Sequence, residues 1–166
     1  MAISKILPLE DVARRLPPLR RAGRTIVHCH GCFDLLHIGH IRHLQAARTM
    51  GDVLVVTITA DEFVDKGEER PAFAEELRAE SLAALECVDF VAVTASPTAV
   101  EAIRLLRPDY YVKGQAAAER PSARFRLETE MVRAAGGEVR FTHEEVFSST
   151  GLLNAHFRVP RGTSST

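Results

Sequence analysis

The stretch HCHGCFDLLHIGHIRH, residues 28–43, holds five of the chain's seven histidines and two of its three cysteines. Imidazole and thiolate groups are ligands that zinc prefers, so a metal site is the first chemistry that this cluster suggests. In an extended strand, however, His28 and His30 point to one face and Cys29 to the other, so they do not converge on a tetrahedral ion. No second Cys-x-x-Cys or paired-histidine motif completes a ligand set, and we predict no metal held by these side chains.

The same stretch has the features of an anion site, because glycines accompany the histidines. Gly31 follows an apolar run, and Gly39 lies at the start of a helical pattern, between His37 and His40. A helix start offers free N–H groups and the positive end of the helix dipole, and a glycine lets a phosphate approach the backbone. Two imidazoles beside it can donate to the same anion. We favour this site over the alternative that these are ordinary core or surface histidines.

The segment GCFDLLHIGH, residues 31–40, resembles the GxFDxxHxGH signature of the cytidylyltransferase-like nucleotidyltransferases, which include glycerol-3-phosphate cytidylyltransferase and bacterial heptose-phosphate adenylyltransferases. Three further segments resemble this family in its own order: ERPAFAEELRAESLAALECVDFV at 69–91, YYVKG at 110–114 and FSSTGLL at 147–153. Class I aminoacyl-tRNA synthetases also use HIGH, but a chain of 166 residues has no room for their lysine loop and anticodon domain.

The resemblance implies attack by a phosphate, or a comparable oxyanion, on the α-phosphorus of a nucleoside triphosphate, with release of pyrophosphate. A phosphate monoester is largely ionised near neutral pH, because its second pKa is about 6, so no general base is needed. The enzyme must instead align two anions and stabilise charge that grows on the phosphoryl oxygens. Mg²⁺ is expected to arrive with the nucleotide, because it needs few protein ligands.

Carried over residue by residue, the resemblance assigns catalysis to His37 and His40, which would contact the triphosphate, and to Lys66 in the loop DKGEER. The expected nucleotide-binding residues are Gly31, Cys32, Phe33, Gly39, Lys113, Gly114, Ser148, Ser149 and Thr150, and the expected acceptor-binding residues are Asp34 and Arg78. Simpler roles stay open for several of them, namely a solvated surface lysine, a turn cap at Asp34, a surface ion pair at Arg78 and helix caps at 148–150.

One segment departs from the family pattern. The family usually places acidic residues, as GD or GDD, after the strand that ends at Gly114, whereas this chain reads KGQAAAERPSARF at 113–125. Acidic groups there could hold sugar hydroxyls, so their absence favours a small phosphate or phosphonate acceptor. On this ground we favour CTP over ATP. The alternatives are an ATP-dependent sugar-phosphate adenylyltransferase of the heptose type and a non-catalytic nucleotide-binding module.

The hydrophobic pattern alternates between strand and helix, which predicts an α/β fold with a Rossmann-like, doubly wound parallel sheet of about five strands. Such folds bind ligands at the carboxyl ends of strands, where the residues above are expected. The expected strands cover 24–30, 52–60, 88–95, 109–114 and 138–144. The expected helices cover 8–23, interrupted at Pro17 and Pro18, then 37–51, 74–86, 96–107 with Ser96 as its N-cap, 123–137 and 148–157.

Composition predicts a single nucleotidyltransferase domain at 1–158, with an N-terminal helix, and a flexible tail or linker at 159–166. A formal net charge of -1 gives no general basic field for nucleic acid. The longest apolar runs are of strand length, which argues against a membrane span, and three cysteines without an apolar leader favour a cytoplasmic protein. The resemblance also implies a homodimer, or one domain of a larger fusion.

Overall fold

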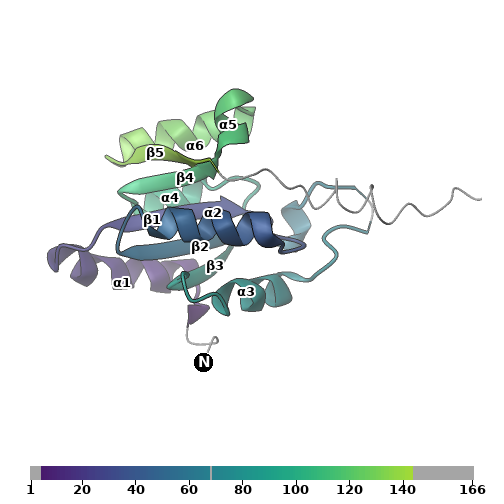
Figure 1. The fold of residues 1–166 in the computed structure, drawn as a ribbon, viewed down its shortest axis with the longest axis horizontal. Coiled ribbons are helices and arrows are strands. Elements are labelled where there is room, and N and C mark those ends of the chain that lie inside the picture. The colour runs from purple at the N-terminus through teal and green to yellow at the C-terminus, as the bar shows by residue number, and fades with distance from the viewer. Residues whose placement is uncertain (1–4, 68, 144–166) are drawn as a thin grey trace, which may run out of the picture.

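A five-stranded parallel sheet forms the centre of the molecule (Figure 1). The computed structural model describes residues 5–67 and 69–143. The strands lie in the order β3-β2-β1-β4-β5 and are β1 (Ile26–Gly31), β2 (Val53–Thr59), β3 (Phe90–Thr94), β4 (Tyr110–Gly114) and β5 (Glu138–Thr142). The helices are α1 (Leu9–Arg21), α2 (Ile38–Arg48), α3 (Glu75–Ala83), α4 (Val100–Leu106), α5 (Gln115–Glu119) and α6 (Ala123–Ala134), with a 3-10 turn at Asp61–Phe63.

Helices cover both faces of the sheet, which confirms the predicted doubly wound α/β class. On one face, Leu44 of α2 and Leu82 of α3 belong to the same buried cluster as Val27 of β1. On the other face, Leu16 of α1 is clustered with Ile26, and α4 and α6 complete this layer. In Figure 1, α2 crosses in front of the sheet. Burial on both faces explains why the strands are almost continuously apolar.

β1 lies in the middle of the sheet, where the chain changes the side on which it adds new strands. The chain adds β2 and β3 on one side of β1 and then returns to add β4 and β5 on the other, all in parallel register. Open α/β sheets bind ligands at such a switch point, beyond the carboxyl ends of the strands. Here that point lies beyond Gly31 of β1 and Gly114 of β4, two strands whose carboxyl ends carry residues of the predicted site.

The first helix runs through both prolines instead of stopping at them. Pro17 and Pro18 lie inside α1, which continues to Arg21, so the predicted interruption is wrong. A proline inside a helix removes a backbone hydrogen bond and costs about 3 kcal/mol or more. The buried apolar face of α1 offsets this cost, and Arg20 anchors the last turn by donating to the Leu106 carbonyl at 2.7 Å.

The fourth helix begins later than predicted, and the N–H group just before it donates to a side chain of another helix. α4 starts at Val100, so Ser96 is not its N-cap. Instead, the buried carboxylate of Glu128 in α6 accepts a hydrogen bond from the Ala99 N–H at 3.0 Å and another from the Tyr111 hydroxyl at 2.9 Å. A tertiary contact thus replaces the local cap that the sequence pattern indicated.

Other differences concern the second half of the chain. α5 was not predicted, because five residues are too few to show helical periodicity. The predicted helix at 148–157, the boundary at residue 158 and the tail at 159–166 lie outside the described residues. Among the helices of the described part of the chain, none is both long enough and apolar enough to cross a bilayer.

Two histidines of β1 are buried on the face that α1, α4 and α6 cover. The Thr57 hydroxyl lies 2.8 Å from both His28 Nε2 and His30 Nδ1, and the Thr59 hydroxyl lies 3.3 Å from His30 Nε2. Burial lowers the pKa of His28 to about 3 and holds the pKa of His30 well below its usual value, and the charge of Lys113 acts in the same direction. Both rings are therefore neutral at pH 7.

Acidification should destabilise the fold through His28. On unfolding this ring regains a pKa of about 6.5, so below that pH the unfolded chain binds a proton that the folded chain does not. Between pH 7 and pH 5 one such group should remove about 2 kcal/mol from the free energy of unfolding, which denaturant titrations can measure. His28→Asn keeps a polar group beside Thr57 but does not titrate. An equal loss in wild type and variant would show that His28 is not the source.

Candidate functional site

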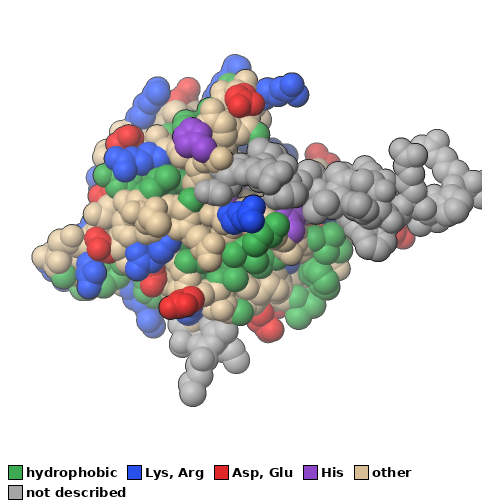
Figure 2. Space-filling view, in the orientation of Figure 1, with side chains coloured by type: hydrophobic (Ala, Val, Ile, Leu, Met, Phe, Trp, Pro, Cys, Tyr) green, Lys and Arg blue, Asp and Glu red, His purple; other side chains and the backbone are tan. Residues whose placement is uncertain are grey.

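Charge on the molecular surface is mixed. Figure 2 shows lysine and arginine side chains interspersed with aspartate and glutamate over one face, in keeping with the formal net charge of -1. A strong attraction for anions must therefore come from a particular site rather than from the whole molecule.

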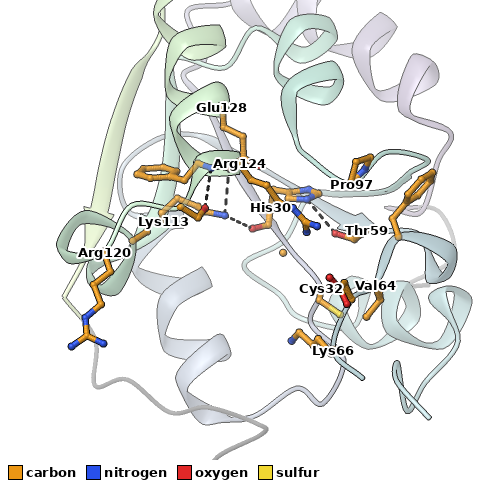
Figure 3. A pocket seen from close by; sticks show the side chains of 16 residues that line it. His30, Cys32, Thr59, Val64, Lys66, Pro97, Lys113, Arg120, Arg124 and Glu128 are labelled. Carbon is orange, nitrogen blue, oxygen red and sulfur yellow. Dashed lines mark hydrogen bonds and ion pairs between the residues drawn. The ribbon is translucent and has the colours of Figure 1, made fainter. Parts of the chain in front are cut away.

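Two cavities open beyond the carboxyl ends of β1 and β4. The histidine cavity, of about 270 Å³, surrounds His37, Gly39, His40, His43, Gly114 and Thr142. The arginine cavity, of about 300 Å³, surrounds Thr59, Phe63, Pro97, Arg120, Arg124 and Glu128 (Figure 3). The two cavities share a wall made of His30, Gly31, Cys32, Lys66 and Lys113. The fold thus brings the predicted HxGH residues and both predicted lysines to one place.

His37 and His40 form the N-terminal cap of α2. His37 Nδ1 accepts a hydrogen bond from the Gly39 N–H at 3.1 Å, and His40 Nδ1 accepts one from the His37 N–H at 3.4 Å. Because each Nδ1 is an acceptor, the proton of each neutral ring is on Nε2, which becomes a donor. The rings stack with their centroids 3.8 Å apart. The cap that fixes the helix start therefore also orients two imidazole donors.

Burial keeps the histidines of this cavity neutral. It lowers the pKa of His37 and brings that of His40 to about 4, where the neighbouring His37, Lys66 and His43 act in the same direction. Burial, with Lys113 nearby, also lowers the pKa of His43 to about 4. Neutral rings can donate hydrogen bonds without adding to the repulsion between the lysines. A bound anion would raise these pKa values, because it favours the protonated form.

The two lysines of the shared wall differ in how firmly they are held. Lys113 Nζ donates to the His30 carbonyl at 3.2 Å and lies 3.9 Å from the Glu128 carboxylate (Figure 3). Lys66 is exposed in the loop after β2, beside Gly67 with φ +101°. Lys113 is thus a fixed charge, whereas Lys66 lies on a loop whose glycine permits a change of conformation.

The backbone after β1 approaches the histidines closely. Phe33 has a left-handed conformation with φ 49°, and its ring lies edge-on to His40 with centroids 5.3 Å apart. A Cβ at Gly31 would come within 3.0 Å of the Phe33 ring. A larger residue at position 31 would therefore displace the ring that supports His40.

Asp34 lies behind the site and borders neither cavity. Its buried carboxylate accepts hydrogen bonds from Arg70 Nε at 2.6 Å and from the N–H groups of Ala72 and Phe73 at 2.8 and 3.1 Å. Burial alone would raise the pKa of Asp34, but these donors outweigh burial and lower it. The contacts tie the end of β1 to the segment that leads into α3, a structural role in place of the expected acceptor contact.

Arg78 is buried as well and also lies outside both cavities. Its guanidinium donates to the carbonyls of Cys32 at 2.7 Å, Thr59 at 2.8 Å and Phe73 at 3.0 Å, and to the Asp61 carboxylate at 2.6 Å. These bonds join the ends of β1 and β2 to α3. We expected Arg78 to contact a ligand or to form an ion pair on the surface. In the structure its buried side chain instead holds together the loops that border the cavities.

The other predicted positions fall into two groups. Gly39 and Gly114, expected to bind nucleotide, line the histidine cavity, and Cys32 lies in the shared wall. Ser148, Ser149 and Thr150 lie outside the described residues, so their roles remain predictions.

Several residues that border the cavities were not predicted from the sequence. His43 Nδ1 lies 2.7 Å from the Thr142 hydroxyl, and its spacing of three residues from the second motif histidine was a signal for the same helix face. Arg120 and Arg124 come from the segment that departs from the family pattern. His30 was assigned to a strand face, but nothing in the sequence indicated that it would reach a cavity.

The zinc alternative finds no support in the described residues. They contain no group of three or more histidine, cysteine, aspartate or glutamate side chains that could hold a metal ion. Cys29, Cys32 and Cys87 are free thiols, and burial raises the pKa of Cys29 to about 12.

Comparisons with known proteins show the family to which the chain belongs. The family model described as cytidylyltransferase-like matches residues 28–158. Bifunctional protein HldE of Syntrophotalea carbinolica is 47% identical over 113 residues, which are 67% of this chain and 23% of that protein. Bifunctional protein HldE of Campylobacter fetus subsp. fetus is 46% identical over 112 residues, which are 66% of this chain and 24% of that protein. The matched region is therefore only about a quarter of the length of these relatives.

Solved structures share the fold. The lipopolysaccharide core biosynthesis protein from Thermoplasma volcanium superposes with a TM-score of 0.61 at 24% identity, covering 76% of this chain and 100% of its own. Pantothenate synthetase from Thermus thermophilus gives a TM-score of 0.57 at 14% identity, over 83% of this chain and 61% of its own. At these identities the likeness concerns the fold alone. Because the family model spans most of the sequence, including the HxGH cap and both lysines, the chain belongs to the cytidylyltransferase-like family of nucleotidyltransferases.

Proposed function

We propose that the chain transfers a nucleoside monophosphate from a triphosphate to a small phosphorylated acceptor and releases pyrophosphate. The observation that carries this proposal is the pair of cavities with one shared wall. A transfer between two anions needs two anion-binding spaces that meet, with positive charge at the junction. Lys66 and Lys113 lie in the shared wall, beside the backbone of Gly31. A module that only binds a nucleotide would need one such space.

In this proposal the triphosphate occupies the histidine cavity and the acceptor the arginine cavity. The Nε2–H groups of His37 and His40 donate to phosphoryl oxygens at the start of α2, where the helix dipole also favours negative charge. An ionised acceptor oxygen forms the new bond to the α-phosphorus, and the bond to the bridging oxygen of pyrophosphate breaks. No proton has to leave the nucleophile, so the protein acts by alignment and charge stabilisation.

Mg²⁺ is expected to enter with the triphosphate. Among the described residues that line the cavities, the carboxylates are Asp65 and Glu128, and Glu128 already accepts hydrogen bonds from Tyr111 and Ala99. This donor set suits an ion that is carried on phosphate oxygens and water rather than one enclosed by protein ligands. The bound ion would offset negative charge on the phosphates.

The relatives favour ATP as donor and a heptose-type sugar phosphate as acceptor. The resemblance to bacterial heptose-phosphate adenylyltransferases, together with the 47% identity to bifunctional protein HldE of Syntrophotalea carbinolica, supports adenylyl transfer over the CTP that we expected. That expectation rested on the missing acidic residues after β4 and on no residue that contacts a base. Since the relatives are much longer, we also propose that the chain works as one domain of a larger fusion.

A pyrophosphate-release assay tests the reaction. The protein is incubated with Mg²⁺, each nucleoside triphosphate and a panel of sugar phosphates, glycerol phosphates and phosphonates. We expect the fastest release with ATP and a sugar phosphate. A clear preference for CTP would show that CTP rather than ATP is the donor. Calorimetric binding of a triphosphate without release from any pair would contradict transfer and leave a nucleotide-binding module.

The donor of His37 can be removed without removing the helix cap. Serine is a good N-cap residue, and its hydroxyl is too short to replace the Nε2–H of the longer imidazole, so His37→Ser should preserve the melting temperature. The variant should lower kcat by about 10²–10³, as expected for one lost preorganised donor, with a much smaller change in KM for the triphosphate. His37→Ala serves as the comparison that also loses the cap. Unchanged kcat in His37→Ser would show that this ring is structural only.

A further inference from the structure

The arginine cavity carries more positive than negative side chains. Its charged residues are four cations and two carboxylates, namely Lys66, Lys113, Arg120, Arg124, Asp65 and Glu128. Both arginines come from residues 115–125, the segment in which the family usually has acidic groups. This chain therefore places cations where a site for sugar hydroxyls would place acceptors.

Arg124 is the arginine best placed to meet a ligand. Figure 3 shows its side chain extending from the start of α6 toward His30, whereas Arg120 points away from the cavity. Arg124 is exposed and forms no ion pair with the carboxylates of the described residues. Glu128, the nearest acid along α6, is buried and accepts hydrogen bonds from the Ala99 N–H and the Tyr111 hydroxyl.

We propose that Arg124 binds the phosphate of the acceptor and thereby selects phosphate monoesters over uncharged sugars or alcohols. A guanidinium can donate two parallel hydrogen bonds to two oxygens of one phosphate, which leaves the third oxygen to attack the α-phosphorus. Lys113, fixed at the junction by the His30 carbonyl, lies on the side from which the triphosphate would approach. This inference rests on the proposed function, because it names the residue that delivers the acceptor.

The rest of the arginine cavity limits the size and polarity of the acceptor. Phe63, Pro97 and Phe125 form apolar parts of its lining, and its volume of about 300 Å³ is at the lower end for small-molecule sites. The phosphate is thus the charged group by which the acceptor is held, and the rest of a sugar phosphate would pack against these apolar side chains. Arg124 borders only this cavity and not the histidine cavity, so its loss should affect the acceptor and spare the triphosphate.

Calorimetric titration separates these effects. The full chain is titrated with ATP and, separately, with sugar 1-phosphates, glycerol 3-phosphate and the corresponding uncharged sugars. Arg124→Ala should weaken binding of the phosphate esters by roughly tenfold or more, because a charge-assisted pair is lost, and leave the affinity for ATP unchanged. Arg124→Lys should recover part of the lost affinity, since it restores the positive charge but not the two parallel hydrogen bonds of the guanidinium. Arg126→Ala is the matched control, an exposed arginine of the same helix that lines neither cavity.

Each outcome decides the inference. A lower affinity for the phosphate esters in Arg124→Ala, with unchanged affinity in Arg126→Ala and for ATP, supports the phosphate site at Arg124. This holds even if the pyrophosphate assay shows no release, a result that would contradict the proposed transfer but not the phosphate site. Equal affinities of Arg124→Ala and Arg126→Ala for the esters would overturn it. So would a matching loss of ATP affinity in Arg124→Ala, or a wild-type protein that binds none of the phosphate esters.

Discussion

The end of β1 is the constraint on which the rest of the site depends. Residues 30–32, at the end of β1 between β2 and β4, border both cavities, and Phe33 borders the histidine cavity. Other elements are fixed against this short backbone. Lys113 donates to the His30 carbonyl, Arg78 donates to the Cys32 carbonyl, and the Phe33 ring supports His40. A shift of this strand end would move the lysine, the histidine donors and the loop into α3 together.

Much of this arrangement could be predicted because its signals are local. A continuously apolar strand, a glycine at its end and a helical pattern after it predict a strand, loop and helix without knowledge of the partners. The HxGH spacing likewise predicts that His37 and His40 lie at one helix start, where the structure finds them as a mutual cap. Repetition of this unit predicted the parallel sheet, and the carboxyl ends of its strands were the expected position of the site, whereas the strand order came only from the structure.

The errors arose where distant contacts decide the local structure. Pro17 and Pro18 stay inside α1 because the buried face of that helix and the Arg20 contact outweigh a local penalty. Arg78 and Asp34 look like ligand residues in sequence, since both accompany the motif segments, but their partners are backbone groups of loops that only the fold brings together. Charge type alone does not reveal whether a side chain faces a cavity or supports its walls.

In the proposed site, charged lysines and neutral histidine donors have separate roles, and burial of the histidines makes this separation possible. We expect Lys66 and Lys113 to supply long-range attraction for anions, and additional cations beside them would repel one another in the empty site. Burial holds the pKa of His40 and His43 near 4, so these rings leave the lysine field unchanged at neutral pH. The packing that lowers these pKa values also fixes the rings, and a donor held in position before the ligand arrives needs no reorganisation during the reaction. Neutrality and preorganisation therefore have the same cause, the close packing of the HxGH cap against the end of β1.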